Sequence, residues 1–274
     1  TGVLGSQIIF QAAYSGKSVV AYDLSDEILA KRPERWEYLK PLYLHDLPDA
    51  TPEKLDAAVA RIRATSELAD AVKDADLIIE AVPERLDIKQ DTWRRVSEVA
   101  PQKTIFATNS STLLPSDIAP ATDRPAKFLA LHFANEVWKN NTGEVMGHAG
   151  TDPQVFEQVA EFAEQIGMVP IRVRKEQPGY VLNSLLVPLL SAAAKLLVRG
   201  VAEPADIDAT WRIATGAPLG PFQIYDVVGM MTPYQLNKDS DDPELRAFAE
   251  MLKRDYIDQG RLGKGAGRGF YDYE

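Results

Sequence analysis

Cysteine is absent from the 274-residue chain, which excludes disulfide bonds and thiolate chemistry. Histidine occurs only as His45, His132 and His148, without the H-x-x-x-H spacing of a helical zinc site, so we predict no metal site. Basic charge is scarce, because 30 Lys and Arg stand against 40 Asp and Glu, a formal net charge of −10. That balance argues against a nucleic-acid or acidic-membrane partner, but it leaves room for a local basic patch that binds a phosphorylated ligand.

Long hydrophobic runs are also missing. The sequence has no 18-residue apolar run and no secretory signal pattern, so we expect a soluble protein whose default location is the cytoplasm. A hydrophobic content of 45% and a charged content of 26% are typical of globular proteins. The length suits two domains better than one core.

The N-terminal stretch carries half of a nucleotide-binding motif. Gly2-Val-Leu-Gly5 precedes a predicted helix at 6–14 and matches the second half of G-x-G-x-x-G. In that motif glycines let the backbone approach a pyrophosphate and let the helix pack on the sheet. The first glycine and the strand before it are not in this sequence. We expect a chain that begins at Thr1 to lack the central strand of its sheet and to bind NAD poorly.

Asp23 follows the next predicted strand, 18–22. An acidic residue about 20 residues after the glycines is where the adenosine ribose hydroxyls are held in this motif. No arginine follows at once, which favours NAD over NADP. The alternative is that Asp23 caps a helix that contains Glu27. With the glycines in place, we favour the ribose role.

Alternating buried strands and amphipathic helices predict a Rossmann-like, doubly wound parallel sheet. We expect strands at 18–22, 76–82, 104–107, up to 132, near 144–146 and at 168–174, with helices at 86–98 and 152–166. Between Glu27 and Ala64 we expect two long helices broken near 48–52, because Leu55, Val59 and Ile62 recur at helical spacing.

The pattern changes at Pro178-Gly179. No convincing strand follows, and helices are expected at 180–198, 205–214, 221–228 and 242–259. We therefore predict an NAD-binding domain at 1–177 and an all-α domain for substrate binding and dimerisation at 178–274. The segment 180–198 is almost entirely apolar, with Pro188 as a possible kink. A helix that is apolar on every side must be buried on every side, which predicts a domain or subunit interface and a homodimer.

Polar residues also follow two apolar runs in the middle of the chain. The first run ends in Asn109, Ser110 and Ser111, the second ends in His132, and Glu144 comes shortly after. A hydroxyl, an imidazole and a carboxylate at one sheet edge would form a general acid/base site. Taken singly, Ser111 is more often a turn residue, His132 a satisfied core histidine and Glu144 a solvated carboxylate. The neighbouring segments favour the site.

Several motifs resemble the 3-hydroxyacyl-CoA dehydrogenase family, in order and spacing, over essentially the whole chain. They are Gly2-Val-Leu-Gly5, Asp23, Glu80-Ala-Val-Pro-Glu84 with Lys89, Asn109-Ser-Ser111, Leu131-His-Phe133, Glu144-Val145, Pro178-Gly179-Tyr-Val-Leu-Asn183 and Gly267-Arg-Gly-Phe-Tyr271. The sequences of segments 107–115 and 131–135 are most similar to those of the diketoreductase-like branch, which reduces keto esters with NADH.

The resemblance implies an NAD-dependent oxidoreductase that interconverts 3-hydroxyacyl and 3-ketoacyl substrates. His132 would be the general acid/base, Glu144 would orient its imidazole, and Ser111 and Asn183 would donate hydrogen bonds to the substrate oxygen. The implied NAD site comprises Gly2, Leu4, Gly5, Asp23, Ala81, Val82, Glu84, Lys89, Asn109 and Asn135.

The resemblance does not imply that this chain requires CoA, because the residues that bind CoA in the family are not found at the matching positions. Members that bind CoA carry a serine and a lysine in the first helical arm, and a gapless count from Asp23 places Leu39 and Asp46 there. An aspartate is a poor partner for phosphate. A CoA thioester is nevertheless one candidate for the small-molecule substrate. The alternatives are a non-CoA hydroxy acid, such as a sugar acid or a carnitine-like compound, and a catalytically silent relative like the lens crystallins of this family.

Overall fold

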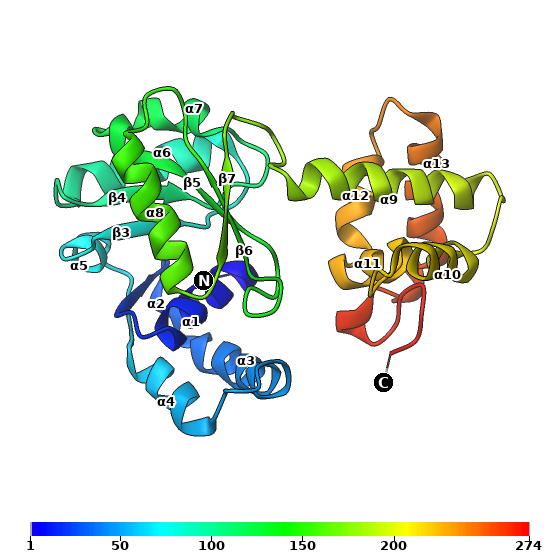
Figure 1. Ribbon diagram of the computed structural model, residues 1–274, viewed down its shortest axis with the longest axis horizontal. Coiled ribbons are helices and arrows are strands. Elements are labelled where there is room, and N and C mark those ends of the chain that lie inside the picture. The colour runs from blue at the N-terminus through cyan, green and yellow to red at the C-terminus, as the bar shows by residue number, and fades with distance from the viewer. Residues whose placement is uncertain (1, 274) are drawn as a thin grey trace. The chain divides into compact units, whose positions relative to one another are not determined.

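The computed structural model describes residues 2–273 and divides into two compact units, Thr1–Val181 and Leu182–Glu274 (Figure 1). The first unit combines strands and helices, whereas the second is built from helices. Each unit has its own hydrophobic core, so each is described separately.

Two sheets form the centre of the first unit. Strands β1 (Val19–Tyr22) and β2 (Ile62–Thr65) make a parallel pair. The larger sheet has the order β3 (Leu77–Glu80), β4 (Ile105–Thr108), β5 (Phe128–Phe133), β6 (Thr142–Met146) and β7 (Val169–Val173). All neighbouring strands in it are parallel except β5 and β6, which are antiparallel. The predicted α/β class with a mainly parallel sheet is confirmed, and the antiparallel pair was not predicted.

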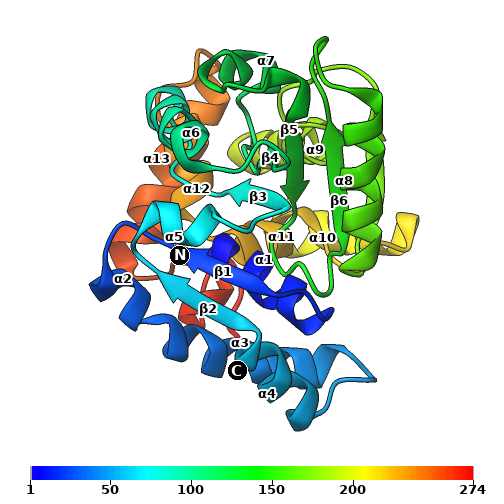
Figure 2. The same cartoon turned by 90° about the vertical axis from the view of Figure 1, so that its left-hand side faces the viewer.

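Helices cover both faces of the larger sheet, and Figure 2 shows α8 alongside β6. The helices of this unit are α1 (Val3–Tyr14), α2 (Asp26–Ala30), α3 (Arg32–Asp46), α4 (Pro52–Ala60), α5 (Leu68–Val72), α6 (Leu86–Val99), α7 (Pro115–Ile118) and α8 (Pro153–Gln165). Successive strand residues point to opposite faces. Accordingly, Leu129 joins the core beneath α1 and α8, while Phe128 packs with Trp93 of α6 on the other face.

The predicted break near 48–52 is confirmed, because α3 ends at Asp46 and α4 begins at Pro52, but the prediction of only two long helices between residues 27 and 64 was wrong. Three helices fill most of this segment, and β2 begins at Ile62, which we had assigned to a helical pattern. The backbone leaves the helix at Arg61, where residues 62–65 take up parallel pairing with β1. That pairing partner lies about forty residues earlier in the chain, so a local periodicity cannot reveal it.

The second unit contains α9 (Leu182–Val198), α10 (Pro204–Thr215), α11 (Pro221–Val228), α12 (Met231–Asn237) and α13 (Pro243–Asp255). Helix α12 was not predicted, and α13 ends at Asp255 rather than at 259. Pro188 lies inside α9. The expectation that this helix is buried on every side was wrong for the single chain, because Leu185 is 70% exposed and only Leu190, Ala193 and Ala194 are buried.

Candidate active site

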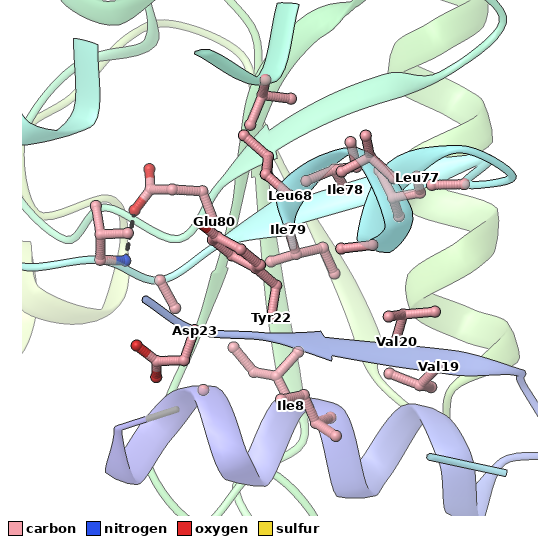
Figure 3. A pocket seen from close by; sticks show the side chains of 18 of the residues that line it. Ile8, Val19, Val20, Tyr22, Asp23, Leu68, Leu77, Ile78, Ile79 and Glu80 are labelled. Atoms are coloured by element: carbon pink, nitrogen blue, oxygen red, sulfur yellow. Dashed lines mark hydrogen bonds between the residues drawn. The ribbon is translucent and has the colours of Figure 1, made fainter. Parts of the chain in front are cut away.

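A large groove opens between β1 and β3, with a volume of about 1760 Å³ (Figure 3). Its sides are apolar, formed by Val19 and Val20 from β1 and by Ile78 and Ile79 from β3. Its polar end lies where these strands finish. Five residues predicted to bind the cofactor line the groove, namely Gly2, Gly5, Asp23, Ala81 and Val82.

The start of α1 suits an anionic group such as a pyrophosphate. Gly2 is the N-cap, makes no side-chain cap bond, and no acidic residue occupies the first turn. A Cβ built on Gly2 would meet nothing within 4 Å, so the backbone there is open to a ligand. A Cβ built on Gly5 would lie 3.7 Å from Ala81 Cβ, an ordinary van der Waals contact, so α1 passes beside the residue that follows β3. A helix N-terminus with this exposure is a natural phosphate site, so these residues fit a dinucleotide.

Asp23 lies directly after β1, at the same end of the groove. The alternative role as a helix cap is wrong, because Ser25 caps α2 and its side chain accepts a hydrogen bond from Ile28 N at 3.4 Å. The carboxylate is thus placed beside the polar end of the groove, as the ribose role requires.

The other predicted cofactor residues lie outside this groove lining. Leu4 packs against the core from α1, and Lys89 is 1% exposed. Asn109 uses its side-chain oxygen to accept a hydrogen bond from Phe133 N at 3.0 Å. Asn135 is exposed after β5, and its carbonyl accepts a bond from Asn140. Their predicted contacts with NAD stay predictions.

His132 and Glu144 form a buried pair across β5 and β6. They are register partners in the antiparallel ladder, and His132 Nδ1 lies 2.9 Å from Glu144 Oε2. Their exposed fractions are 4% and 3%, so Glu144 is not the solvated carboxylate of the ordinary interpretation. A carboxylate at Nδ1 selects the tautomer that protonates Nδ1 and leaves Nε2 available for proton transfer.

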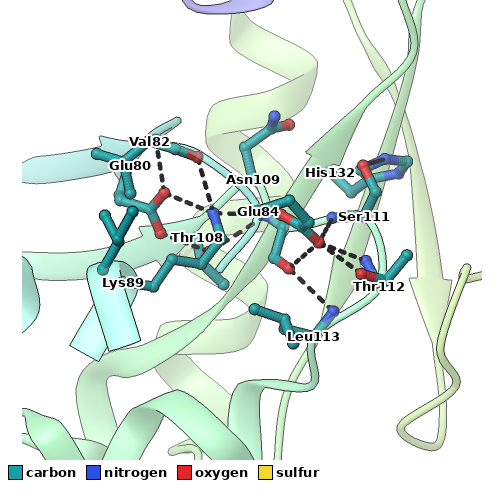
Figure 4. Close-up of polar contacts among 12 residues, drawn as sticks. Glu80, Val82, Glu84, Lys89, Thr108, Asn109, Ser111, Thr112, Leu113 and His132 are labelled. Atoms are coloured by element: carbon teal, nitrogen blue, oxygen red, sulfur yellow. Dashed lines mark hydrogen bonds and ion pairs between the residues drawn. The ribbon is translucent and has the colours of Figure 1, made fainter. Parts of the chain in front are cut away.

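Ser111 completes a chain of three polar groups. Its Oγ lies 3.2 Å from His132 Nε2, the nitrogen on the far side of the ring from Glu144 (Figure 4). The serine sits in the loop that follows β4. The hydroxyl is therefore within hydrogen-bond reach of the imidazole, and the imidazole is within reach of the carboxylate. Such an arrangement is suited to general acid/base chemistry.

Glu84 holds the loop that carries Ser111 (Figure 4). One carboxylate oxygen, Oε1, accepts bonds from Ser110 Oγ at 2.6 Å, Ser111 N at 2.9 Å, Thr112 N at 2.7 Å and Thr112 Oγ1 at 2.9 Å. Partial burial raises the pKa of Glu84, but these hydrogen bonds and the nearby Lys89 charge outweigh it and hold the pKa at about 2. Glu84 is therefore ionised at neutral pH.

A second pair lies beneath that loop. Lys89 Nζ is 2.7 Å from Glu80 Oε1 and 3.4 Å from Glu84 Oε2. The other oxygen of Glu80 accepts a bond from Thr108 Oγ1 at 2.8 Å. A buried ion pair is tolerated only when its groups have partners, and these groups do. The network also links Glu80, at the end of β3, to Thr108, at the end of β4.

Two contacts, the first at His132 and the second at the end of α3, were not predicted from the sequence. Tyr180 stacks on His132, with ring centroids 4.5 Å apart and an interplanar angle of 12°. Asp46, at the end of α3, accepts bonds from Trp138 Nε1 at 2.8 Å and His45 Nδ1 at 2.9 Å. The bonds from Trp138 and His45 hold the pKa of Asp46 at about 2. The sequence signals were weak: Tyr180 directly follows Gly179, and Trp138 comes two residues before an asparagine pair.

Asn183, the fourth predicted catalytic residue, lies in the first turn of α9. It belongs to the second unit, whereas Ser111, His132 and Glu144 belong to the first. Its predicted contact with the substrate oxygen stays a prediction.

Comparison with known proteins assigns both units. The family models described as "3-hydroxyacyl-CoA dehydrogenase, NAD binding domain" and "3-hydroxyacyl-CoA dehydrogenase, C-terminal domain" match residues 1–177 and 179–273. A helix that starts at a glycine and a strand that ends at an acidic residue are features of dinucleotide-binding domains. The chain belongs to the 3-hydroxyacyl-CoA dehydrogenase family. It is an NAD-dependent oxidoreductase of the type that acts on CH–OH groups.

Individual relatives agree with this assignment. The mitochondrial hydroxyacyl-coenzyme A dehydrogenase of Rattus norvegicus is 33% identical, covering 100% of this chain and 89% of the relative. A probable 3-hydroxybutyryl-CoA dehydrogenase of Bacillus subtilis is 32% identical, covering 100% and 95%.

Solved structures agree as well. One, titled "Substrate-directed dual catalysis of dicarbonyl compounds by diketoreductase", is 57% identical with a TM-score of 0.94, covering 100% of this chain and 96% of the other. The (S)-3-hydroxybutyryl-CoA dehydrogenase from Ralstonia eutropha is 29% identical with a TM-score of 0.81 and the same coverage. Separately, no helix within residues 2–273 is long and apolar enough to cross a membrane.

Proposed function

We propose that the chain interconverts a 3-hydroxy and a 3-keto acyl compound, with His132 as the acid/base. The observation that carries this proposal is the continuous chain from Ser111 Oγ through the His132 imidazole to the Glu144 carboxylate. A buried imidazole with one nitrogen held by a carboxylate and the other beside a hydroxyl is suited to moving a proton at one defined position.

Each side chain then has a distinct task. In oxidation His132 Nε2 removes the proton of the 3-hydroxyl group, and in reduction it returns a proton to the keto oxygen. Glu144 accepts the Nδ1–H bond and stabilises the imidazolium that forms. Ser111 Oγ, with Asn183 as a proposed second donor, hydrogen-bonds the substrate oxygen as charge develops there. Bound NAD supplies the hydride acceptor in oxidation, and NADH supplies the donor in reduction.

For the cofactor, we propose that Gly2, Gly5 and the α1 N-terminus hold the pyrophosphate and that Asp23 holds the adenosine ribose. Support comes from their shared place at one end of the groove. The remaining residues of the proposed site, which come from the family resemblance, are Leu4, Ala81, Val82, Glu84, Lys89, Asn109 and Asn135.

The proposed substrate is a CoA-free 3-keto or 3,5-diketo ester. Support comes from the 57% identity to a structure whose title names a diketoreductase acting on dicarbonyl compounds. Support also comes from Asp46, whose carboxylate already pairs with Trp138 and Lys139, and which would repel a phosphate. The competing candidate is a CoA thioester, because curated relatives at 32–33% identity are named as CoA dehydrogenases.

The test is NADH oxidation with acetoacetyl-CoA and, in parallel, with a CoA-free 3-keto or 3,5-diketo ester. Equal or higher kcat/KM with the free ester supports the proposed substrate. A much higher kcat/KM with acetoacetyl-CoA would reject it and would identify a CoA-dependent enzyme. No NADH consumption with either compound, despite NADH binding, would favour a silent relative or a different hydroxy acid.

We also propose that residues 178–274 mediate a homodimer. Support comes from large apolar side chains that are exposed in the single chain, including Leu185 and Val187 of α9 and Ile213 of α10. Sedimentation velocity tests this: a dimer that dissociates on dilution, and that Leu185→Glu disrupts, agrees with the proposal. A monomer at every concentration contradicts it. The cytoplasmic location remains a prediction.

A further inference from the structure

The short segment 179–181 touches each group of the proposed acid/base chain. Gly179 N donates to the Ser111 carbonyl at 3.1 Å. The Tyr180 hydroxyl donates to the Ser110 carbonyl at 2.8 Å, and Val181 N donates to Glu144 Oε1 at 2.8 Å. All of these residues belong to the first unit.

Between these bonds the Tyr180 ring covers one face of His132. The rings are nearly parallel, 12° apart, with their centroids separated by 4.5 Å. Tyr180 is 1% exposed and His132 is 4% exposed, so the stack is buried. The stacked ring therefore limits tilting of the imidazole about its bond to Glu144.

The backbone of Tyr180 is held in an unfavourable conformation. Its φ is +54°, in the left-handed region that bulky residues rarely adopt. Such a conformation persists only where surrounding contacts enforce it, and it is concentrated at functional sites. The contacts of Gly179, Tyr180 and Val181 are of this enforcing kind.

We propose that Tyr180 is a positioning residue for the acid/base chain. Its ring fixes the plane of His132, and its hydroxyl fixes the loop that carries Ser111. This inference rests on the proposed function of His132. Burial, followed by the charges of Glu84 and Glu144, raises the pKa of the Tyr180 hydroxyl, so the hydroxyl stays a hydrogen-bond donor and takes no part in proton transfer.

Three substitutions separate the ring from the hydroxyl and from the backbone. Tyr180→Phe keeps the ring and removes the hydroxyl. Tyr180→Leu removes the ring and keeps an apolar side chain. Tyr180→Asn also removes the ring, and asparagine tolerates the left-handed backbone, so this variant remains informative if the leucine variant does not fold. The matched control is Tyr225→Leu, because Tyr225 is another buried tyrosine, 3% exposed, whose hydroxyl donates to a backbone carbonyl, that of Leu190, at 2.9 Å.

We expect kcat to fall on the order of 100-fold in Tyr180→Leu and Tyr180→Asn, because misplacing a reacting group by about 1 Å has that effect. The KM for NADH should stay within about twofold, since the lost interaction acts in the chemical step. Tyr180→Phe should keep most of the parental kcat, because Glu84 still holds the Ser111 loop through Ser111 N and Thr112 N. Tyr225→Leu should lower the melting temperature and leave kcat of the folded protein near that of the parent.

A measurement independent of turnover reports the stack directly. The chain has three histidines, so the His132 ring proton resonances can be assigned by their loss in His132→Asn. An aromatic ring over the imidazole shifts its carbon-bound proton resonances upfield by its ring current. Tyr180→Leu and Tyr180→Asn should move the His132 resonances downfield, whereas Tyr180→Phe should leave them near their original position.

The outcomes distinguish the two proposals. If His132→Asn keeps its turnover, the proposed function of His132 fails, whatever Tyr180 does. If His132→Asn is inactive but both Tyr180→Leu and Tyr180→Asn retain parental kcat, the positioning role of Tyr180 is wrong. Equal loss of kcat in Tyr180→Phe and Tyr180→Leu would also overturn the role of the ring.

Discussion

His132 and Glu144 are direct partners across antiparallel strands β5 and β6, with imidazole Nδ1 2.9 Å from carboxylate Oε2. Side chains of directly opposed residues project from the same face of a sheet, within contact distance of each other. The pair is therefore held by the ladder itself rather than by a flexible loop. Orientation of the imidazole follows from strand register, which is difficult to change by small local motions.

His132→Asn should abolish most turnover. Removing the proposed general acid/base should lower kcat by about 10²–10⁴-fold, the usual contribution of such a group. NADH binding, followed by fluorescence titration, should change little. His148→Asn is the control, because His148 bonds backbone groups of Pro125 and Gly150 away from the site. Near-parental kcat in His132→Asn would refute the assigned role.

Glu144→Gln removes the charge that stabilises the imidazolium, and it turns an amide NH₂ group toward either His132 Nδ1 or Val181 N, both of which contact the carboxylate. We expect kcat to fall roughly 10²–10⁴-fold, as for a neutralised carboxylate behind a catalytic histidine. Stopped-flow measurement of a single turnover separates this chemical step from product release. Glu157→Gln, which alters an exposed pair with Arg172, should leave the rate unchanged.

Asp23→Ser should alter the choice of cofactor. Loss of charged hydrogen bonds to the ribose hydroxyls should weaken NADH binding by roughly 10–100-fold. Binding of NADPH should weaken much less, because its 2′-phosphate is repelled by the carboxylate. Titration calorimetry with both cofactors checks this, with Asp26→Ser as the control. An unchanged ratio of the two dissociation constants would count against the ribose role.

Glu84 should make stability depend on acid pH. Its folded-state pKa of about 2 lies below the usual value of 4.5. A carboxyl whose pKa is depressed by folding stabilises the protein above the unfolded pKa, and that contribution is lost as pH falls from about 4.5 towards 2.

The melting temperature of Glu84→Gln should therefore lie below that of the parent at pH 6, and the difference should shrink towards pH 3. Scanning calorimetry of both proteins across this range gives the comparison. Glu98→Gln, a change at an exposed residue of α6, should run parallel to the parent. A difference that stays constant across the range would contradict the assigned contribution.

Asp226 should be essential to the second unit. It is 1% exposed and accepts bonds from Phe270 N at 2.7 Å, Tyr271 N at 2.9 Å and Tyr273 Oη at 2.8 Å. Asp226→Asn places an amide donor against these donors, which should cost roughly 2–4 kcal/mol in the free energy of unfolding. Urea denaturation measures the change, and the exposed Asp239→Asn is the control. If Asp226→Asn lowers the free energy of unfolding no more than Asp239→Asn does, the C-terminal residues are held by other contacts.

The sequence was sufficient for elements with strong local patterns. The apolar spacing of α6 and α8 and the buried runs of β3 and β4 are confirmed. It failed at β2, because the segment from Ile62 to Thr65 becomes a strand only by pairing with β1. It also failed for the exposed half of α9, since an apolar composition does not state which surface covers it.

Residue chemistry and order along the chain were enough to select Ser111, His132, Glu144 and Asp23 and to indicate the family. Tertiary structure alone decided how they act on one another. The antiparallel pairing of β5 with β6 puts His132 opposite Glu144. Glu84 and Tyr180 contact Ser110 from positions 26 and 70 residues away along the chain. Such contacts depend on the packing of strands and loops that are distant in sequence. No local pattern encodes that packing, because its energy comes from the whole assembled core.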